Sequence, residues 1–296
     1  MRLIDRWLAR YAKPEPSALE AVRGLKPMTV VTGASRGIGL AMARRFARAG
    51  NDVALIARHA DALDAAATRI AADYPITAIA IPMDVTDPEA IDRIGTQLGA
   101  HGFYIDVLIN NAGVGLAGPF AYQSQDAIGH LVDLNVMALT RMTRAVLPHM
   151  LARGHGGIIN LASLGGLVPG PNQAVYYASK AYVISLTRAL AAEIPGRGVR
   201  MLAIAPGPVD TGFHRAMGSE LSFYRQVLFA LSARHVAFES YLAFKLGLHL
   251  YVPGLTGKVL QIAVWIIPHA LLLPLVGWLL RRREERPWHH GDDRPA

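Results

Sequence analysis

Short apolar runs recur along the chain and alternate with longer segments of helical periodicity. Each run is rich in Val, Ile and Leu and has the length of a buried strand. The predicted strands are Met28–Thr32, Asp52–Ile56, Asp106–Asn110, Gly157–Leu161, Arg200–Ala205 and Leu248–Val252, with one more strand ending at Asp84. Two helices are well marked, one with Leu40, Ala43, Phe46 and Ala47 on its apolar side and one over Ala174–Glu193. This alternation predicts an α/β fold with an open parallel sheet.

A glycine-rich turn follows the first predicted strand. It has the sequence GASRGIG, covers Gly33 to Gly39 and runs directly into an amphipathic helix. In this context glycines permit a tight turn, let the backbone approach a pyrophosphate and leave the helix N-terminus facing the negative charge. The spacing GxxxGxG differs from the usual GxGxxG of dinucleotide sites, so a plain turn remains the alternative.

Small and polar residues also follow three later strands. Asn111 to Gly113 follows the first of them, Ser163 the second and Pro206-Gly207 the third. Ligands of open parallel sheets bind at the carboxyl edge of the strands. The sequence therefore predicts a ligand site formed by these segments together with the glycine turn.

Tyr176 and Lys180 lie four positions apart in the long predicted helix. This spacing places both side chains on one face, a single turn apart. A tyrosine phenol normally titrates near pH 10, but a neighbouring ammonium group favours the phenolate and lowers that pKa. The pair can then act as a general acid/base on a nearby substrate oxygen. A surface Tyr–Lys pair is the alternative.

Together these segments resemble the short-chain dehydrogenase/reductase family. Seven motifs match in order between about Met28 and Gly254: TGASRGIG (Thr32 to Gly39), DVTD (Asp84 to Asp87), NNAG (Asn110 to Gly113), Asn135 in DLNV, Ser163, YYASK (Tyr176 to Lys180) and PGPVDT (Pro206 to Thr211). The resemblance implies a Rossmann-like, doubly wound parallel sheet of about seven strands, in a single domain with N- and C-terminal appendages. We divide the chain into an N-terminal amphipathic helix and linker (1–26), a catalytic domain (27–254) and an apolar helical tail with a polar C-terminus (255–296).

The resemblance also implies a catalytic role for each of four residues. Tyr176 would exchange a proton with the substrate oxygen, and Lys180 would lower the tyrosine pKa and hold the nicotinamide ribose. Ser163 would hydrogen-bond the carbonyl and stabilise developing negative charge. Asn135 would lie within a helix and hold a water that links Lys180 to solvent. Taken singly, Ser163 could cap a turn and Asn135 could be a satisfied core amide.

The residues around the second strand favour NADP(H) as the cofactor. NAD-preferring folds place an acidic residue after this strand, where the chain has Ala57 followed by Arg58. Arg36 in the glycine turn is a second arginine that suits a 2′-phosphate, unless both arginines are solvated loop residues. By resemblance, the cofactor-binding residues are Gly33, Ser35, Arg36, Gly37, Ile38, Gly39, Arg58, Asp84, Val85, Asn111, Ala112, Gly113, Tyr176, Lys180, Pro206, Gly207, Val209 and Thr211.

Composition excludes some partners. The chain has 296 residues, 52% of them hydrophobic, and a formal net charge of +8. We find no basic stripe with interleaved aromatic residues, so we expect no nucleic-acid partner. The chain has no cysteine and no convincing His/carboxylate cluster, so we predict no metal site. We expect a cytoplasmic protein, with the inner face of a membrane as an alternative location.

Both ends of the chain carry unusual apolar segments. Residues 1–13 place Leu3, Ile4, Trp7, Leu8 and Tyr11 at helical spacing beside basic residues, which suits a helix at a membrane interface or one packed on the core or on another subunit. Val259–Leu280 carries no formal charge and is interrupted by Pro268, Pro274 and Gly277. Three interpretations of this tail remain open: a broken helical pair that dips into a membrane or covers the substrate entrance, a subunit interface, or a transmembrane span.

The apolar tail and the apolar loop after Thr211 suggest a hydrophobic substrate. We expect a ketone or aldehyde reductase, or a secondary-alcohol dehydrogenase, that acts on a carbonyl or alcohol such as a long-chain 3-keto lipid, a retinoid or a steroid-like alcohol. A homo-oligomer with peripheral membrane contact is the expected form. The alternatives are a non-catalytic NADP-binding regulatory protein and a membrane-tethered interaction protein.

Overall fold

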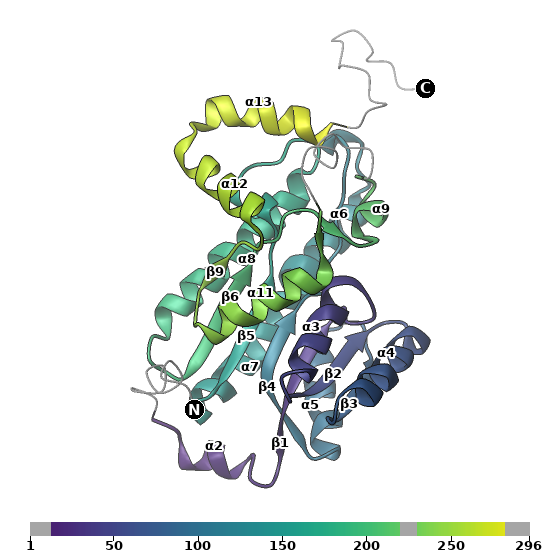
Figure 1. The fold of residues 1–296 in the computed structure, drawn as a ribbon, viewed down its shortest axis with the longest axis vertical. Coiled ribbons are helices and arrows are strands. Elements are labelled where there is room, and N and C mark those ends of the chain that lie inside the picture. The colour runs from purple at the N-terminus through teal and green to yellow at the C-terminus, as the bar shows by residue number, and fades with distance from the viewer. Residues whose placement is uncertain (1–12, 220–229, 282–296) are drawn as a thin grey trace.

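A parallel seven-stranded sheet with helices on both faces forms the body of the protein (Figure 1). The computed structural model describes residues 13–219 and 230–281. The sheet has the order β3-β2-β1-β4-β5-β6-β9. Its strands are β1 (Lys26–Thr32), β2 (Asp52–Ala57), β3 (Ala78–Pro82), β4 (Phe103–Asn110), β5 (Gly156–Leu161), β6 (Val199–Ile204) and β9 (Leu250–Tyr251), and a small second sheet pairs β7 (Val209–Asp210) with β8 (Leu231–Ser232).

Helices connect most of the strands. They are α2 (Pro16–Glu20), α3 (Gly37–Ala47), α4 (Ala60–Asp73), α5 (Ala90–Ala100), α6 (Gln125–Val132), α7 (Leu139–Arg153), α8 (Ala174–Glu193), α9 (Phe213–Met217), α11 (Ala233–Lys245), α12 (Leu255–Ile266) and α13 (His269–Leu280). A π-helical segment, η2 (Asp133–Ala138), joins α6 to α7, and two short 3-10 helices are η1 (Phe120–Tyr122) and η3 (Leu164–Leu167).

Two hydrophobic cores hold these layers together. Residues of α5, α7 and α8 pack on one face of the sheet, and residues of α3, α4 and α11 pack on the other. Successive residues of β1 show the division, since Val30 belongs to the first core and Val31 to the second. Burial on both faces explains why the central strands are continuous apolar runs.

The α/β, doubly wound parallel sheet predicted from the sequence is confirmed. Helix α8 has the predicted bounds, and every predicted strand is present. The last strand is shorter than expected, because only Leu250 and Tyr251 pair with β6. Asp84 does not end β3, which stops at Pro82. Instead, its carboxylate accepts hydrogen bonds from the backbone N and the hydroxyl of Thr86, which form a turn after the strand.

The glycine turn is clamped against the end of β4. Gly33 has a φ of 63°, in the left-handed region that favours glycine. A Cβ at Gly33 would lie 2.9 Å from Asn111 Nδ2, and a Cβ at Gly39 would overlap the Gly33 carbonyl and the same amide. Asn111 Nδ2 donates to the carbonyl oxygens of Thr32 (2.8 Å) and Gly33 (3.1 Å). Close backbone approach therefore fixes the edge at which the order of the strands reverses.

The C-terminal tail forms two helices, which we call the hairpin (α12 and α13). It lies at the end of the molecule opposite α2 (Figure 1). The break comes at Ile267 and Pro268, whereas Pro274 and Gly277 lie inside α13 and do not end it. Within residues 13–219 and 230–281, no helix has both the length and the apolarity needed to cross a membrane. The amphipathic helix predicted over residues 1–13 lies outside the described residues, apart from Lys13.

The packing of Gly39 gives a stability prediction. Gly39→Ala should lower the free energy of unfolding by about 1–3 kcal/mol, because the added methyl group overlaps backbone that has little room to move. Gly95→Ala is the matched control, since Gly95 also lies in a helix but a Cβ there meets nothing within 4 Å. The control should be stabilised by up to about 1 kcal/mol. Urea unfolding compares the two, and equal changes would contradict the tight turn.

Candidate active site

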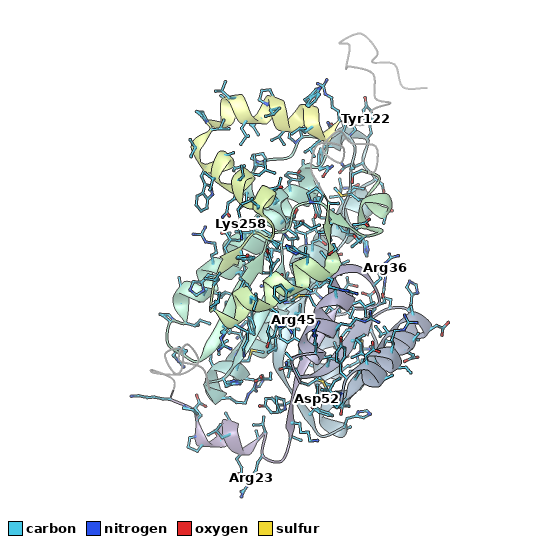
Figure 2. The ribbon with its side chains drawn as sticks, viewed as in Figure 1. Arg23, Arg36, Arg45, Asp52, Tyr122 and Lys258 are labelled. Atoms are coloured by element: carbon cyan, nitrogen blue, oxygen red, sulfur yellow. The ribbon has the colours of Figure 1, made fainter. Side chains whose placement is uncertain are left out.

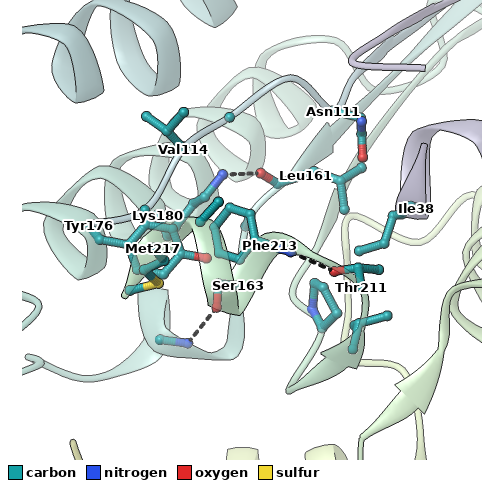
Figure 3. A pocket seen from close by; sticks show the side chains of 18 of the residues that line it. Ile38, Asn111, Val114, Leu161, Ser163, Tyr176, Lys180, Thr211, Phe213 and Met217 are labelled. Atoms are coloured by element: carbon teal, nitrogen blue, oxygen red, sulfur yellow. Dashed lines mark hydrogen bonds between the residues drawn. The ribbon is translucent and has the colours of Figure 1, made fainter. Parts of the chain in front are cut away.

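One large cavity lies along the carboxyl edge of the sheet. Its volume is about 1100 Å³, and it extends from the glycine turn past the ends of β4, β5 and β6 to the hairpin. The predicted catalytic and cofactor-binding residues come together there with two exceptions, because Gly39 and Asn135 do not line the cavity. Figure 3 shows Tyr176, Lys180 and Ser163 around the same part of it.

Tyr176 and Lys180 lie near the start of α8, one turn apart as predicted. Both are largely buried, and Lys180 Nζ lies 5.9 Å from the centroid of the Tyr176 ring. The ring also packs against Phe213 of α9, with a centroid distance of 5.7 Å. The alternative of a surface Tyr–Lys pair is therefore wrong for these two residues.

Burial controls the charge of Lys180. Its side chain is 5% exposed, and Nζ donates a 2.8 Å hydrogen bond to the carbonyl oxygen of Leu161 at the end of β5. Removal from water disfavours the ammonium form, which lowers the pKa of Lys180 from its ordinary value of 10.5 to about 8. The group still carries its proton for most of the time at neutral pH, so it can act as a cation beside Tyr176.

Ser163 caps a turn and also faces the cavity. Its Oγ accepts a 3.1 Å hydrogen bond from the backbone N of Gly165 at the start of η3. A hydroxyl that accepts in this way keeps its own hydrogen for a second partner. A Cβ at Gly166 would lie 2.6 Å from the backbone of Lys180, so the lack of a side chain there lets this loop rest directly on α8.

Asn135 lies behind the cavity wall. The side chain is 1% exposed and lies in the π-helical segment η2. Oδ1 accepts from Val114 N at 2.9 Å, and Nδ2 donates to Val114 O at 2.8 Å and to Ser179 Oγ at 3.2 Å. Asn135 therefore holds the loop after β4 against α8, as a satisfied core amide does. Its predicted link between Lys180 and solvent stays a prediction.

The other end of the cavity fits a dinucleotide. Gly33, Ser35, Arg36 and Gly37 line it beside the N-terminus of α3, where unpaired backbone N–H groups favour a phosphate. A side chain at Gly37 would be strained, because its φ is 61°. The cavity continues from this turn to Lys180 without interruption. These residues would hold the phosphates at one end and the nicotinamide ribose at the other.

Charged groups lie where the adenosine end would bind. Arg58 and Asp84 both line the cavity. Burial raises the pKa of Asp84, but hydrogen bonds from Thr86 and the positive charge of Arg58 outweigh this effect and leave the pKa below its ordinary value. Asp84 is thus a carboxylate at neutral pH, close enough to Arg58 for the guanidinium to lower its pKa.

Gln173, a buried polar residue of the cavity wall, is absent from the predicted site residues, as are His59, His130, Tyr177 and Asp210 of the same wall. Gln173 is 2% exposed, lines the cavity, and its Nε2 has no hydrogen-bond partner. It precedes Tyr176 by three positions, a spacing that places both on one side of the start of α8. That spacing was the signal that could have revealed it. A buried donor without a partner is costly, so a ligand oxygen would stabilise it.

The sequence model of one family matches the chain over residues 27–222, and its description is "short chain dehydrogenase". The chain belongs to this family. NAD(P)-dependent oxidoreduction is typical of this family, in agreement with what the motifs predicted.

Known relatives of this short-chain dehydrogenase include reductases of acyl substrates. It is 38% identical to the very-long-chain 3-oxoacyl-CoA reductase of Anas platyrhynchos over 193 residues, which are 64% of this chain and 61% of that protein. It is 38% identical to a ketoacyl reductase of Nostoc sp. over 181 residues, which are 61% of this chain and 63% of that protein. The match thus spans less than two thirds of either relative.

A solved relative contains a bound cofactor. It is a short-chain dehydrogenase from Sphingobium yanoikuyae in complex with NADPH, 30% identical, with a TM-score of 0.71. The likeness covers 83% of this chain and 97% of that one.

The burial of Lys180 predicts a pH dependence of stability. The folded protein releases the Lys180 proton near pH 8, whereas the unfolded chain keeps it to about pH 10.5. Between these values the unfolded state binds more protons, so Lys180 makes the free energy of unfolding rise with pH. Below pH 8 both states are protonated and the burial cost is fully present.

Urea unfolding of the cofactor-free protein from pH 7 to 10.5 measures this rise. Lys180→Met removes the titrating group, so the curve of the variant should be flatter than that of the wild type. Parallel curves would show that Lys180 titrates normally.

Proposed function

We propose that this short-chain dehydrogenase reduces the ketone of a hydrophobic, lipid-like substrate with NADPH. The observation that carries the proposal is the continuity of the cavity. One space joins the glycine turn, the Tyr176–Lys180–Ser163 group and an apolar wall. From the hairpin, that wall includes Leu260, Ala263, Val264, Ile267, Leu272, Leu275, Val276, Leu279 and Leu280.

The catalytic residues would stabilise and protonate the substrate oxygen. Bound NADPH supplies the hydride, which no side chain can provide. Tyr176 would donate its phenolic proton to the oxygen as negative charge develops there. Lys180 would favour the resulting phenolate through its positive charge. Ser163 would donate the hydrogen that its cap leaves available, which stabilises the same oxygen.

Two arginines, and the absence of an acidic residue at the end of β2, support NADP(H) over NAD(H). Arg36 and Arg58 are exposed side chains at the cavity, and β2 ends at Ala57 where an acidic residue would serve NAD. A guanidinium matches a 2′-phosphate, whereas a carboxylate would repel it. The NADPH in the Sphingobium yanoikuyae relative is consistent with this preference.

Gln173 supports a substrate with a second oxygen near the reacting ketone. Its unpartnered amide lies in the same wall as Tyr176. A 3-oxoacyl group offers such an oxygen in its thioester carbonyl and adds an apolar chain that suits the hairpin. Two relatives named as 3-oxoacyl-CoA and ketoacyl reductases favour the same class.

Loss of the Tyr176 hydroxyl should abolish reduction. With NADPH and 3-oxoacyl thioesters, Tyr176→Phe should lower kcat by about 100-fold or more and leave NADPH binding intact, because only the acid is lost. Tyr182→Phe is the matched control. It removes a hydroxyl from the same helix, where the group is hydrogen-bonded to Thr140 Oγ1 and away from the cavity.

The same assay tests the substrate class. The activity on 3-oxoacyl thioesters should exceed the activity on methyl ketones of equal chain length, since the methyl ketones lack the second oxygen. Should Tyr176→Phe retain more than about a tenth of the wild-type kcat, the acid/base assignment is wrong. If the methyl ketones are equally good substrates, the 3-oxoacyl proposal fails while the acid/base proposal stands.

Arg58→Asp should reverse or abolish the cofactor preference. The wild type should have a kcat/KM at least about tenfold higher with NADPH than with NADH, because Arg58 pairs with a charged phosphate. The variant removes that attraction and adds a repulsion. Arg69→Asp, an equal charge change on the exposed side of α4, is the control. Equal efficiency of the wild type with both cofactors would contradict the assignment.

A further inference from the structure

The hairpin carries a second apolar surface that faces away from the cavity. We call it the outer face: Leu255, Val259, Ile262, Trp265 and Ile266 of α12, and Leu271 and Trp278 of α13. These side chains are between 49% and 79% exposed. On α12, Leu255, Val259, Ile262 and Ile266 recur at intervals of four, three and four residues, which places them along one side of the helix.

The inner sides of the same helices are also apolar, because they form the cavity wall. Helices that are apolar on all sides are normally buried in a core or in lipid. In this structure the inner side of the hairpin lines the cavity, and the outer face is exposed to solvent. Exposed large hydrophobic side chains gathered in this way mark an interaction surface.

Charge and length indicate what covers the outer face. Between Lys258 and Arg281 the chain carries no formal charge, and these two basic residues flank the hairpin at its two ends. Figure 2 labels Lys258 beside the base of α12. The whole chain has a net charge of +8, which is complementary to anionic phospholipid headgroups. Tryptophans beside aliphatic residues, with basic residues at the border, are typical of surfaces in the membrane interface.

Each helix is too short to cross a bilayer. Both have twelve residues, which corresponds to about 18 Å at 1.5 Å per residue, against a hydrocarbon core of about 30 Å. A pair of such helices can lie within one leaflet and expose its outer face to the acyl chains.

We propose that the outer face of the hairpin docks the protein on one leaflet of an anionic membrane. The hairpin then separates the lipid from the cavity by the thickness of one helix layer. A lipid-like substrate could pass from the leaflet into the cavity around α12 and α13. This entry route rests on the proposed function, whereas the docking itself does not.

Flotation of the full chain with vesicles tests the docking. The vesicles contain phosphatidylcholine and phosphatidylglycerol. Ile266→Glu and Leu271→Glu each place a charge on the outer face without altering a residue that lines the cavity. Each should lower the partition coefficient at least about tenfold, because a charged side chain replaces an aliphatic one that docking would bury in lipid. Leu246→Glu, at a leucine that is 58% exposed at the C-cap of α11, should float like the wild type.

Salt and activity separate the remaining explanations. Wild-type binding should weaken but persist in about 0.5 M salt, since the apolar contribution is not screened. Both variants should reduce a water-soluble ketone at the wild-type rate, so a loss of flotation is not a loss of folding. This readout keeps docking distinct from the proposed substrate.

Three results would overturn the docking. In the first, both variants float as well as the wild type, so another segment binds the membrane. In the second, binding disappears entirely in salt. In the third, the wild type stays in solution as an oligomer that Ile266→Glu dissociates, which would make the outer face a subunit interface.

Discussion

The buried ammonium group of Lys180 is the constraint on which the site depends. Its hydrogen bond to the carbonyl oxygen of Leu161 ties α8 to the end of β5, so the helix cannot shift along the sheet without leaving a buried charge unpaired. Tyr176 is one turn earlier on the same helix and is placed by the same bond. The loop after β5 carries Ser163, and it rests on the Lys180 backbone because Gly166 has no side chain. One costly charge thus brings Tyr176, Lys180 and Ser163 together at the edge of the sheet.

A line of buried amides and hydroxyls supports that edge from below. Asn110 Nδ2 donates to Thr143 Oγ1 and to Asn160 Oδ1, and Asn160 Nδ2 donates to Thr187 Oγ1. These bonds connect β4, α7, β5 and α8 within the core. The amide N–H groups of Asn110 and Asn160 are paired in this network, whereas Asn110 Oδ1 accepts no hydrogen bond. A slip of one element would leave these buried donors without partners as well, which favours a single arrangement. Helix α8 is therefore held at two places, by this network in the core and by Lys180 at the cavity.

Local signals made most of the site predictable. The glycine turn, the Tyr176–Lys180 spacing and the residues after each strand depend on the chain near them, and all of these segments meet at one cavity. The position of Asn135 depends on distant contacts with Val114 and Ser179, so no sequence pattern placed it behind the wall. The unpaired amide of Gln173 was hidden for the same reason, because a missing partner is visible only in three dimensions. In the tail, three residues could have broken the helix. Only Pro268 does so. Gly277 lies inside α13, where it packs against Pro171 from another part of the chain.

The hairpin connects the chemistry to the surroundings of the protein. A cavity wall that contacts a hydrophobic substrate must be apolar. A helix of twelve residues that forms part of such a wall has few positions left for polar groups. In α12 and α13 most of those positions are apolar as well, which leaves a large hydrophobic area exposed. A soluble enzyme for a small polar ketone would gain nothing from such a surface and would risk aggregation. An enzyme whose substrate is dissolved in lipid needs contact with that lipid on the side where the substrate enters. The apolar inner and outer sides of one thin layer are therefore consistent with a single requirement, access from a membrane to the Tyr176 site.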